Sequence, residues 1–378
     1  MTTPMKVGVI GCGQISGIYI ETLQKMKNVE VLACADIAPH AARFRAEMYG
    51  IPRVHTPEQL FADPDIEAVL NTTIPEAHTQ VNLAALGAGK HVYTEKPLAI
   101  TCEDGRRVLD LAARKGLCVG CAPDTFLGAG IQTCVRLVAD GAIGTPVAAF
   151  AFMMHHGPET PPNRGPAVES PTRRRVTPKD PGHYYVPGWG PLFDMGPYYL
   201  TALANLIGPV RRATGSARIT WPQRPVGAPR FKVHVPSHIA AVLDHENGTV
   251  TTLVTSTDVW PSGFPHLEIH GEKGSLRAPD PNTFGGPVLL RAANEREWRQ
   301  VPLTHGYAQD SRGLGLAEMA QSIRVGRVPR ASGAMAFHVV DIAEAVHVAS
   351  RENRHVPVTS TFPRPSPMPV SGAEEEVL

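Results

Sequence analysis

The feature that most constrains the fold of this chain is a glycine turn between an apolar run and a stretch with helical spacing. The run 7–10 leads directly into Gly-Cys-Gly-Gln-Ile-Ser-Gly at positions 11–17. Glycine adopts backbone conformations that other residues avoid, and it lets a ligand approach the backbone closely. A strand, a glycine turn and a helix in this order predict a βαβ unit whose turn faces a ligand.

The same alternation of apolar runs and helical segments continues to Ala122. The helical segments carry clear start signals, such as Thr-Pro-Glu-Gln at 56–59 and Thr-x-x-Asp at 101–104. Alternation of this kind predicts βαβ units and a parallel sheet. The predicted strands are 7–10, 29–35, 66–70, 91–94 and 117–121.

A carboxylate at the end of the second run fits a dinucleotide. Gly11 permits a tight turn, Gly13 lets a pyrophosphate approach, and the N-terminus of the following helix attracts phosphate. Asp36 lies about 20 residues beyond the turn, where it would accept both ribose hydroxyls and repel a 2′-phosphate. The predicted cofactor is therefore NAD; a structural turn followed by a helix-capping aspartate is the alternative. The turn residues expected to bind it are Gly11, Cys12, Gly13, Gln14 and Ile15.

After Ala122 the pattern becomes that of an α+β domain. Strand candidates follow one another from 211 to 302, and Asn-Gly at 247–248 between two alternating runs is a strong hairpin signal. Helices are predicted over 129–140, 192–207, 313–324 and 334–351, with a proline-rich stretch without periodicity at 157–191. We expect an α/β protein in three parts: a Rossmann dinucleotide-binding domain (1–122), an α+β domain with a large, mainly antiparallel sheet (123–362), and a disordered tail (363–378).

Composition excludes several other classes of protein. The 378 residues contain 36 Lys and Arg against 35 Asp and Glu, without the positive excess of a nucleic-acid-binding protein. No run approaches the roughly 18 apolar residues of a membrane span, and the first residues leave no room for a signal peptide. The Cys-x-x-Cys at 118–121 has no second pair, so no metal site is predicted. We expect a cytoplasmic protein with neither nucleic acid nor membrane as a partner.

Two further strand ends carry polar side chains. They are the segments 71–78 and 94–97, the second of which reads Thr-Glu-Lys-Pro. Open parallel sheets bind ligands beyond the carboxyl ends of their strands. A lysine placed there can exchange a proton with a substrate if its surroundings lower its pKa from about 10.4. A solvated loop is the alternative for Lys96.

These motifs, in this order, resemble the Gfo/Idh/MocA oxidoreductases over nearly the whole chain. The resemblance rests on Gly-x-Gly-x-x-Ser, Asp36, Thr-x-Ile-Pro-x-x-His at 72–78 and Glu-Lys-Pro at 95–97. It implies that Lys96 is a general acid or base near the reacting carbon and that Glu95 contacts the nicotinamide ribose. The remaining residues expected around the cofactor are Thr72, Thr73, Pro75, His78, Lys96 and Asp124.

A third motif, Leu-Phe-Asp-Met-Gly-Pro-Tyr-Tyr at 192–199, begins a predicted helix. Asp194 and Tyr198 are four residues apart, so their side chains would share one helix face. The family pattern has an aspartate and a histidine beside the reacting hydroxyl, and this sequence has Tyr198 where the histidine would fall. The resemblance implies catalytic roles for Lys96, Asp194 and Tyr198, but it leaves open which of Lys96 and Tyr198 holds the proton. A helix cap at Asp194 and core packing of Tyr198 are the structural alternatives.

Aromatic and hydrogen-bonding side chains around the proline-rich stretch suit a sugar ring. The residues expected to bind substrate are Lys96, His155, Tyr185, Asp194 and Tyr198. The resemblance also implies that the second-domain sheet buries one face in a homodimer or homotetramer.

We therefore predict an NAD-dependent oxidoreductase that transfers hydride between the nicotinamide and a secondary alcohol of a sugar, glycoside or cyclitol. The nearer alternative is a redox-neutral enzyme with tightly bound NAD that cleaves, eliminates or epimerises through a transient keto-sugar. A non-catalytic, NAD-binding regulator is the more distant one. The sequence determines neither the sugar, nor the carbon, nor the physiological direction.

Overall fold

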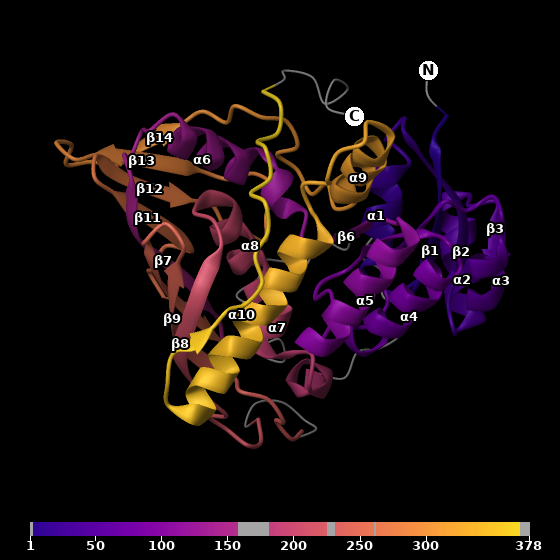
Figure 1. Cartoon of the computed structure of the whole chain (residues 1–378), viewed down its shortest axis with the longest axis horizontal. Helices are drawn as coiled ribbons and strands as arrows, with labels where there is room; N and C mark the ends of the chain where they lie inside the picture. Colours follow the sequence, from indigo (N-terminus) through magenta and orange to yellow (C-terminus); the bar gives the residue numbers. More distant parts are fainter. Residues whose placement is uncertain (1–2, 158–180, 225–230, 261, 371–378) are drawn as a thin grey trace.

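The chain folds into two units, each built on one sheet, that lie side by side (Figure 1). A computed structural model describes residues 3–157, 181–224, 231–260 and 262–370. The long helix α10 (Gly333–Glu352) contacts α5 (Cys102–Lys115) of the first unit and β8 (Val210–Arg218) of the second. The last helix of the described chain therefore ties the two units together.

The first unit is a parallel sheet of six strands in the order β3-β2-β1-β4-β5-β6. This confirms the predicted parallel sheet. The short strand β3 was not predicted, because its three residues are only partly buried and carry no apolar run. The strands are β1 (Met5–Ile10), β2 (Val29–Ala35), β3 (Arg53–His55), β4 (Ala68–Asn71), β5 (His91–Thr94) and β6 (Val119–Cys121). The strand order changes direction between β1 and β4, which is where open α/β sheets bind ligands.

The helices of the first unit begin where the sequence signals predicted. Thr56 and Gln59 form a capping box, with Gln59 N donating to Thr56 Oγ1 at 3.3 Å and Thr56 N donating to Gln59 Oε1 at 2.9 Å. Thr101 caps α5 by accepting from Asp104 N at 3.2 Å. The other helices are α1 (Ser16–Leu23), α2 (Pro39–Tyr49), α3 (Pro57–Ala62) and α4 (Pro75–Gly87).

The second unit is a sheet of nine strands in the order β14-β13-β12-β11-β7-β10-β9-β8-β15. Every neighbouring pair is antiparallel except β10 and β7, which confirms the predicted mainly antiparallel sheet. The predicted hairpin is present, with Gly248 at φ +89° between β9 and β10. The strands are β7 (Pro146–Met154), β8, β9 (His238–His245), β10 (Val250–Ser256), β11 (Leu267–Gly271), β12 (Gly274–Ala278), β13 (Val288–Ala292), β14 (Arg299–Val301) and β15 (Val356–Pro357).

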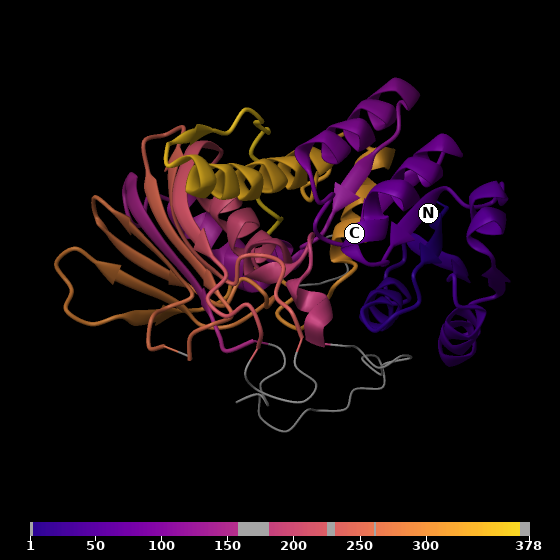
Figure 2. The same cartoon turned by 90° about the horizontal axis from the view of Figure 1, so that it is seen from below.

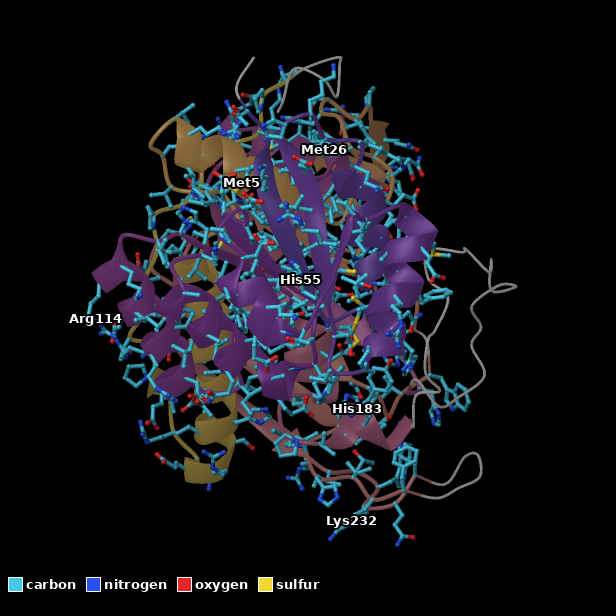
Figure 3. The ribbon with its side chains drawn as sticks, turned by 90° about the vertical axis from the view of Figure 1, so that its right-hand side faces the viewer. Met5, Met26, His55, Arg114, His183 and Lys232 are labelled. Carbon is cyan, nitrogen blue, oxygen red and sulfur yellow. The ribbon has the colours of Figure 1, made fainter. Side chains whose placement is uncertain are left out.

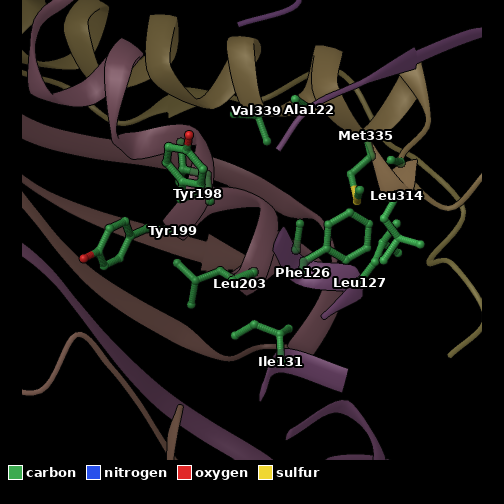
Figure 4. Packing of buried hydrophobic residues seen from close by; sticks show 14 of the residues in the cluster. Ala122, Phe126, Leu127, Ile131, Tyr198, Tyr199, Leu203, Leu314, Met335 and Val339 are labelled. Atoms are coloured by element: carbon green, nitrogen blue, oxygen red, sulfur yellow. The ribbon is translucent and has the colours of Figure 1, made fainter. Parts of the chain in front are cut away.

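Helices cover one face of this curved sheet, and the hydrophobic core of the second unit lies between the helices and the sheet (Figure 2). They are α6 (Ala129–Ala139), α8 (Gly196–Leu206) and α10, with the short η1 (Thr125–Leu127) beside them. Figure 4 shows Phe126, Ile131, Leu203, Leu314 and Met335 meeting there, although they come from five separate segments. Leu314 begins α9 (Leu314–Arg324), so the core continues to the junction of the two units.

The single helix predicted over 192–207 is divided in two. α7 (Gly190–Asp194) ends before Met195, and α8 starts at Gly196. Pro197 lacks the backbone N–H that would bond to the Phe193 carbonyl in one continuous helix, and proline is favoured in the first turn, so one helix stops and a second begins. The division places Asp194 at the end of one helix and Tyr198 in the first turn of the next.

The segment 363–370 lies in an ordered, extended path where we expected a disordered tail. Arg364 donates to the carbonyls of Asn205 and Leu206 at the end of α8, both at 2.7 Å. Met368 is buried, and its N–H donates to Gln132 Oε1 at 2.8 Å. Backbone and side-chain partners can thus fix a proline-rich segment. Residues 371–378 and most of the stretch 157–191 lie outside the described residues, and 181–185 forms a short 3-10 helix, η3.

Candidate active site

The glycine turn is fixed against the end of β4. Gly11 has φ +91°, and a Cβ atom there would lie 2.7 Å from the carbonyl of Thr72 and from Thr73 N. Thr72 Oγ1 donates to Gly11 O at 2.6 Å. Only glycine therefore fits at position 11, and the turn and the β4 end form one rigid edge.

The same turn is open on the side of Gly13. A Cβ atom at this position would meet no described atom within 4 Å. The Gly13 carbonyl accepts from Ser16 Oγ and from Arg45 Nη2, both at 2.8 Å, so it is turned away from the open side. An open glycine at the start of α1 suits a phosphate group, and the residues present thus fit a dinucleotide.

Asp36 stands directly after β2, beside the turn. Its Oδ2 accepts from Cys12 N at 2.7 Å, and its Oδ1 accepts from Ala38 N at 2.8 Å. Asp36 therefore also has the structural role named above as the alternative, because it fixes the backbone before α2. Each carboxylate oxygen keeps a further lone pair for a ribose hydroxyl, so the two roles are compatible.

Glu95 connects the end of β5 with the first helix. Its Oε1 accepts from the Tyr19 hydroxyl at 2.6 Å, and its Oε2 accepts from Lys96 N at 3.0 Å. Burial, together with the charge of Glu95, raises the pKa of Tyr19 well above its usual range, so the phenol keeps its proton and donates. Contact of Glu95 with a nicotinamide ribose stays a prediction.

His78 braces the loop that carries Lys96. The side chain has no exposed surface; Nδ1 lies 2.7 Å from Pro97 O, and Nε2 lies 3.2 Å from Thr73 O. Burial lowers its pKa, which favours the neutral ring. A direct contact of His78 with a cofactor would require neighbouring backbone to move, so the structure gives it a supporting position under Lys96-Pro97, whose peptide bond is cis.

Asp124 holds the start of α9. Its Oδ2 accepts from Gly313 N at 2.8 Å and from Gly315 N at 2.9 Å. Burial outweighs these two donors and raises the pKa of Asp124 to about 6. Its buried Oδ1 has no hydrogen-bond partner among the described residues. The predicted contact with the nicotinamide amide stays a prediction, and what the structure shows is a cap on a helix from the far end of the chain.

The contact between Lys96 and Asp194 joins the two units. Lys96 Nζ donates to Asp194 Oδ1 at 2.7 Å and to the Asp194 carbonyl at 2.6 Å. Burial disfavours the charged lysine, but its polar neighbours, above all the Asp194 carboxylate, outweigh burial and raise the pKa of Lys96. The ammonium is therefore a firmly held cation at the edge where the cofactor is expected.

Tyr198 stands beside this ion pair. Lys96 Nζ lies 5.3 Å from the centroid of its ring. Its neighbour Tyr199 points elsewhere, with its hydroxyl 2.8 Å from His266 Nδ1, and the two side chains diverge in Figure 4. The structure thus brings the three predicted catalytic residues together, although Asp194 and Tyr198 come from different helices.

The structure adds Arg312, which sequence reasoning missed, and shows what fixes Trp189 of the aromatic segment expected to suit a sugar ring. The guanidinium of Arg312 lies with Cζ 5.9 Å from the Tyr198 ring centroid. Trp189 Nε1 donates to Glu76 Oε1 at 3.0 Å, which fixes the segment before α7 to the N-terminus of α4. In Figure 3, the nearby His183 lies at the lower edge of the first unit, in agreement with this contact. Arg312 had no signal, because it follows a region without motif or periodicity.

Two further residues predicted to bind substrate, Tyr185 and His155, have protein partners in the structure. Tyr185 is fully buried, with its ring 5.3 Å from that of Phe231 and 4.9 Å from Arg224 Cζ. Contact of Tyr185 with a substrate would therefore require its neighbours to move. His155 continues from β7; its N–H donates to Ser256 O at 3.1 Å, and its Nδ1 accepts from Gly157 N at 3.0 Å. A role for His155 in substrate binding stays a prediction.

Two classes of site are absent from the described part of the chain. Among its helices, none is both long and apolar enough to cross a bilayer. Within the same ranges, no group of three or more His, Cys, Asp or Glu side chains is placed to hold a metal ion.

Comparisons with known proteins agree with the fold. A model of an oxidoreductase family with an NAD-binding Rossmann fold matches residues 5–122, and a model of the GFO/IDH/MocA C-terminal domain matches residues 131–277. Inositol 2-dehydrogenase 3 from Saccharopolyspora erythraea is 27% identical over 300 residues, covering 78% of this chain and 80% of that protein. A 1,5-anhydro-D-fructose reductase from Ensifer adhaerens is 33% identical over 157 residues, which cover 41% of this chain and 46% of the reductase.

Solved structures share the fold. A levoglucosan dehydrogenase in complex with NADH and levoglucosan has a TM-score of 0.78 at 18% identity, covering 95% of this chain and 100% of that one. An NAD-binding oxidoreductase from Klebsiella pneumoniae has a TM-score of 0.80 at 20% identity, with the same coverage. The chain thus belongs to the Gfo/Idh/MocA family of oxidoreductases, and its first unit is the NAD-binding Rossmann domain of that family.

Proposed function

We propose that the protein is an NAD-dependent dehydrogenase acting on a secondary alcohol of a sugar, glycoside or cyclitol. The observation that carries this proposal is the contact of Lys96, on the cofactor edge, with Asp194 of the second unit at 2.7 Å. It places a cation, a carboxylate and the Tyr198 phenol at the boundary between the two units. The names of the relatives, which include inositol, levoglucosan and anhydrofructose enzymes, support a polyol substrate.

The residues divide the work between binding and proton transfer. Gly11, Gly13 and Asp36 would hold NAD, which supplies the hydride acceptor when bound. Lys96 donates a hydrogen bond to the reacting oxygen, and Asp194 keeps the ammonium in place by accepting from it twice. Tyr198 stands within reach of the same oxygen, so that one of these groups exchanges its proton.

The test is to follow NADH absorbance when purified protein is mixed with NAD and a panel of polyols. The panel contains myo-inositol, scyllo-inositol, levoglucosan and a set of aldoses and glycosides, with 1,5-anhydro-D-fructose and NADH for the reverse direction. Continuous NADH formation with one polyol supports the proposal and identifies the substrate class. A bound-cofactor signal that changes once and then stops, with product accumulating, would replace it with the redox-neutral mechanism. No response, together with unchanged function of a Lys96→Ala and Asp194→Ala double variant in the cell, would favour a regulator.

We further propose that the uncovered sheet face binds a second copy of this chain. Phe150, Val242 and Val250 on adjacent strands β7, β9 and β10 are each more than a third exposed. The exposed Phe264 stacks on Phe152 of the same face, with ring centroids 4.9 Å apart. Contiguous apolar surface of this kind marks an interface. Sedimentation should show a dimer or tetramer that dissociates in Val242→Glu and remains in the control Ala113→Glu, at an exposed position of α5 in the first unit; a monomeric wild-type chain would reject the proposal. The cytoplasmic location stays a prediction.

A further inference from the structure

Tyr198 lies close to two cations that come from opposite ends of the chain. Lys96 Nζ is 5.3 Å and Arg312 Cζ is 5.9 Å from the centroid of its ring. The tyrosine is 7% exposed and Arg312 is 8% exposed, so both positive charges act on the phenol with little intervening water. The function proposed above uses Lys96 and Tyr198 but assigns nothing to Arg312.

Arg312 is held firmly from the side away from Tyr198. Its Nη1 donates to Asp310 Oδ1 at 2.6 Å, and its Nη2 donates to Asn282 Oδ1 at 2.7 Å. The next residue, Gly313, has φ +110°, and its N–H is fixed by the Asp124 carboxylate. A chain of contacts thus runs from the end of the Rossmann sheet, through Asp124 and the start of α9, to the guanidinium.

The Arg312 guanidinium restricts the hydrogen-bonding role of the Tyr198 hydroxyl. Burial disfavours the charged form of Arg312, but its polar neighbours Tyr198 and Asp310 outweigh burial and raise its pKa. Arginine has only donors and keeps its proton. A hydrogen bond between these two side chains would have the Tyr198 oxygen as its acceptor, which leaves the phenol proton available for a substrate oxygen.

Lys96 is less suited to take up a proton. Two of its three N–H groups are committed to Asp194, and the ion pair keeps the amine charged. A charged amine can donate a hydrogen bond to the substrate and stabilise negative charge on a neighbouring oxygen, but it has no lone pair with which to accept a proton.

We propose that Arg312 is a positioning residue that acts through Tyr198: together with Lys96 it holds the phenol between two fixed cations, and the phenol exchanges the proton with the substrate oxygen. In the reductive direction the O–H bond of Tyr198 breaks as a new O–H bond forms on the substrate oxygen, leaving a phenolate between the two cations. In the oxidative direction the same proton returns to the phenolate. This proton transfer rests on the dehydrogenase function proposed above.

Other charged groups near Tyr198 are engaged elsewhere. Asp194 and Asp310 pair with Lys96 and Arg312, and Glu95 accepts from Tyr19. The neighbouring β7 and η1 carry no titratable side chain, and Cys134 of α6 is buried. Four titratable groups of α10 have other partners: His338 contacts Val210 and Ser360, Asp341 contacts Thr359, Glu344 contacts Cys102, and His347 stacks on Phe193.

The first experiment needs no substrate. Tyrosine labelled with carbon-13 at the ring carbon that bears the hydroxyl gives one NMR signal for each of the eight tyrosines of the full chain, and the signal lost in Tyr198→Phe is that of Tyr198. We expect this signal to move in Arg312→Gln, because the carbon next to the oxygen responds to loss of a charged donor, and to move less in Arg312→Lys. An unmoved Tyr198 signal in folded Arg312→Gln would overturn the proposal.

Arg330→Gln is the matched control. The Arg330 side chain is also only 11% exposed, and it pairs with Glu318 of α9 at 2.7 Å. Its loss should lower the melting temperature and leave the Tyr198 signal in place. If Arg312→Gln does not fold, Asp310→Ala removes the acceptor that orients the guanidinium, and it should move the same signal by a smaller amount; no movement there would count against the proposal equally.

The second experiment is kinetic and uses the polyol found in the panel. Arg312→Gln should lower kcat by roughly 10- to 100-fold, less than the roughly 10²- to 10⁴-fold contribution of a proton-transfer group, because Arg312 acts through Tyr198, and it should leave the KM for NAD unchanged. In a Tyr198→Phe background the same substitution should cost nothing further, because an effect exerted through Tyr198 disappears with it. Additive losses would reject action through Tyr198. If no polyol is oxidised, the dehydrogenase proposal fails, while the NMR result still decides whether Arg312 acts on Tyr198.

Discussion

The two units hold their site residues by different means. On the cofactor side, short bonds between neighbouring strand ends fix the backbone, as Thr72 fixes Gly11 and Asp36 fixes Cys12. On the substrate side, charges hold side chains that come from separate helices and loops, as in the contact of Lys96 with Asp194. The first arrangement follows from one βαβ pattern, whereas the second exists only when the two units are docked. Changes on the cofactor side should therefore affect stability and NAD binding, and changes at the junction should affect turnover.

The largest effect is expected where the two sides meet. Lys96→Ala removes the cation that contacts Asp194 and Tyr198, and it should lower kcat by about 10²- to 10⁴-fold with nearly unchanged NAD affinity. Steady-state kinetics with the identified polyol and NAD titration by fluorescence measure the two quantities separately. Lys25→Ala, at a largely exposed lysine after α1, should change neither. Near-wild-type turnover in Lys96→Ala would remove the lysine from the mechanism.

The next effect concerns the pH dependence of stability at the junction. The pKa of Asp124 is about 6 in the folded protein, above the value of 3.8 usual for an aspartate. The folded state therefore binds more protons than the unfolded state between these values, and the free energy of unfolding should fall as pH rises from about 4 to 6, by about 3 kcal/mol.

Asp124→Asn should remove this slope, since an asparagine oxygen can still accept from the Gly313 and Gly315 amides without burying a charge. Urea unfolding at a series of pH values compares the two proteins. If the variant shows the same slope as the wild type over this range, the carboxyl of Asp124 is not its source.

A pair of glycine variants separates stability from cofactor binding on the cofactor side. Gly11→Ala forces a Cβ against the Thr72 backbone at a positive φ and should lower the free energy of unfolding by about 1 to 3 kcal/mol. Gly13→Ala places its Cβ in open space, so the protein without cofactor should unfold nearly as the wild type does. Its NAD affinity should nevertheless fall, because the new methyl group occupies the side on which a pyrophosphate is expected. Unfolding curves and NAD titrations of both variants test this, and full NAD affinity in Gly13→Ala would exclude that side of the turn.

The smallest effect is expected at the link between α1 and Glu95. Tyr19→Phe removes the donor to Glu95 Oε1 and leaves a buried acceptor without it, which should cost about 1 kcal/mol of unfolding free energy. The catalytic rate should change less than in Lys96→Ala, because Lys96 N still donates to Glu95 Oε2. Thermal unfolding and kcat of Tyr19→Phe against the wild type provide the measurement. A kcat loss as large as that of Lys96→Ala would mean that Tyr19 belongs to the reacting groups.

Much of the first unit could be predicted because its signals are local. The turn at Gly11, the caps at Thr56 and Thr101 and the apolar runs each depend on residues close in sequence, and the structure has the corresponding elements. The hairpin at Asn247-Gly248 is local in the same sense. The break between α7 and α8 was missed although Gly196-Pro197 marks it, because the helical spacing on both sides is continuous.

The candidate site could be predicted only in part, for the same reason. Lys96, Asp194 and Tyr198 stand in motifs that resemble a family, and the structure brings them together. Arg312 stands in no motif, and nothing near it in sequence indicates that it reaches Tyr198. The burial of His78 and Tyr185, and the cap that Asp124 places on α9, depend on segments up to 191 residues away.

The sequence by itself determined the family, the NAD-binding Rossmann domain and the order of strands and helices, because periodicity, turns and caps act over a few residues. Only the tertiary structure decided which side chains share the site and how readily each of them is protonated. The pKa values of Lys96 and Asp124 depend on burial and on charges brought from the other end of the chain, and these exist only after the two units have packed together.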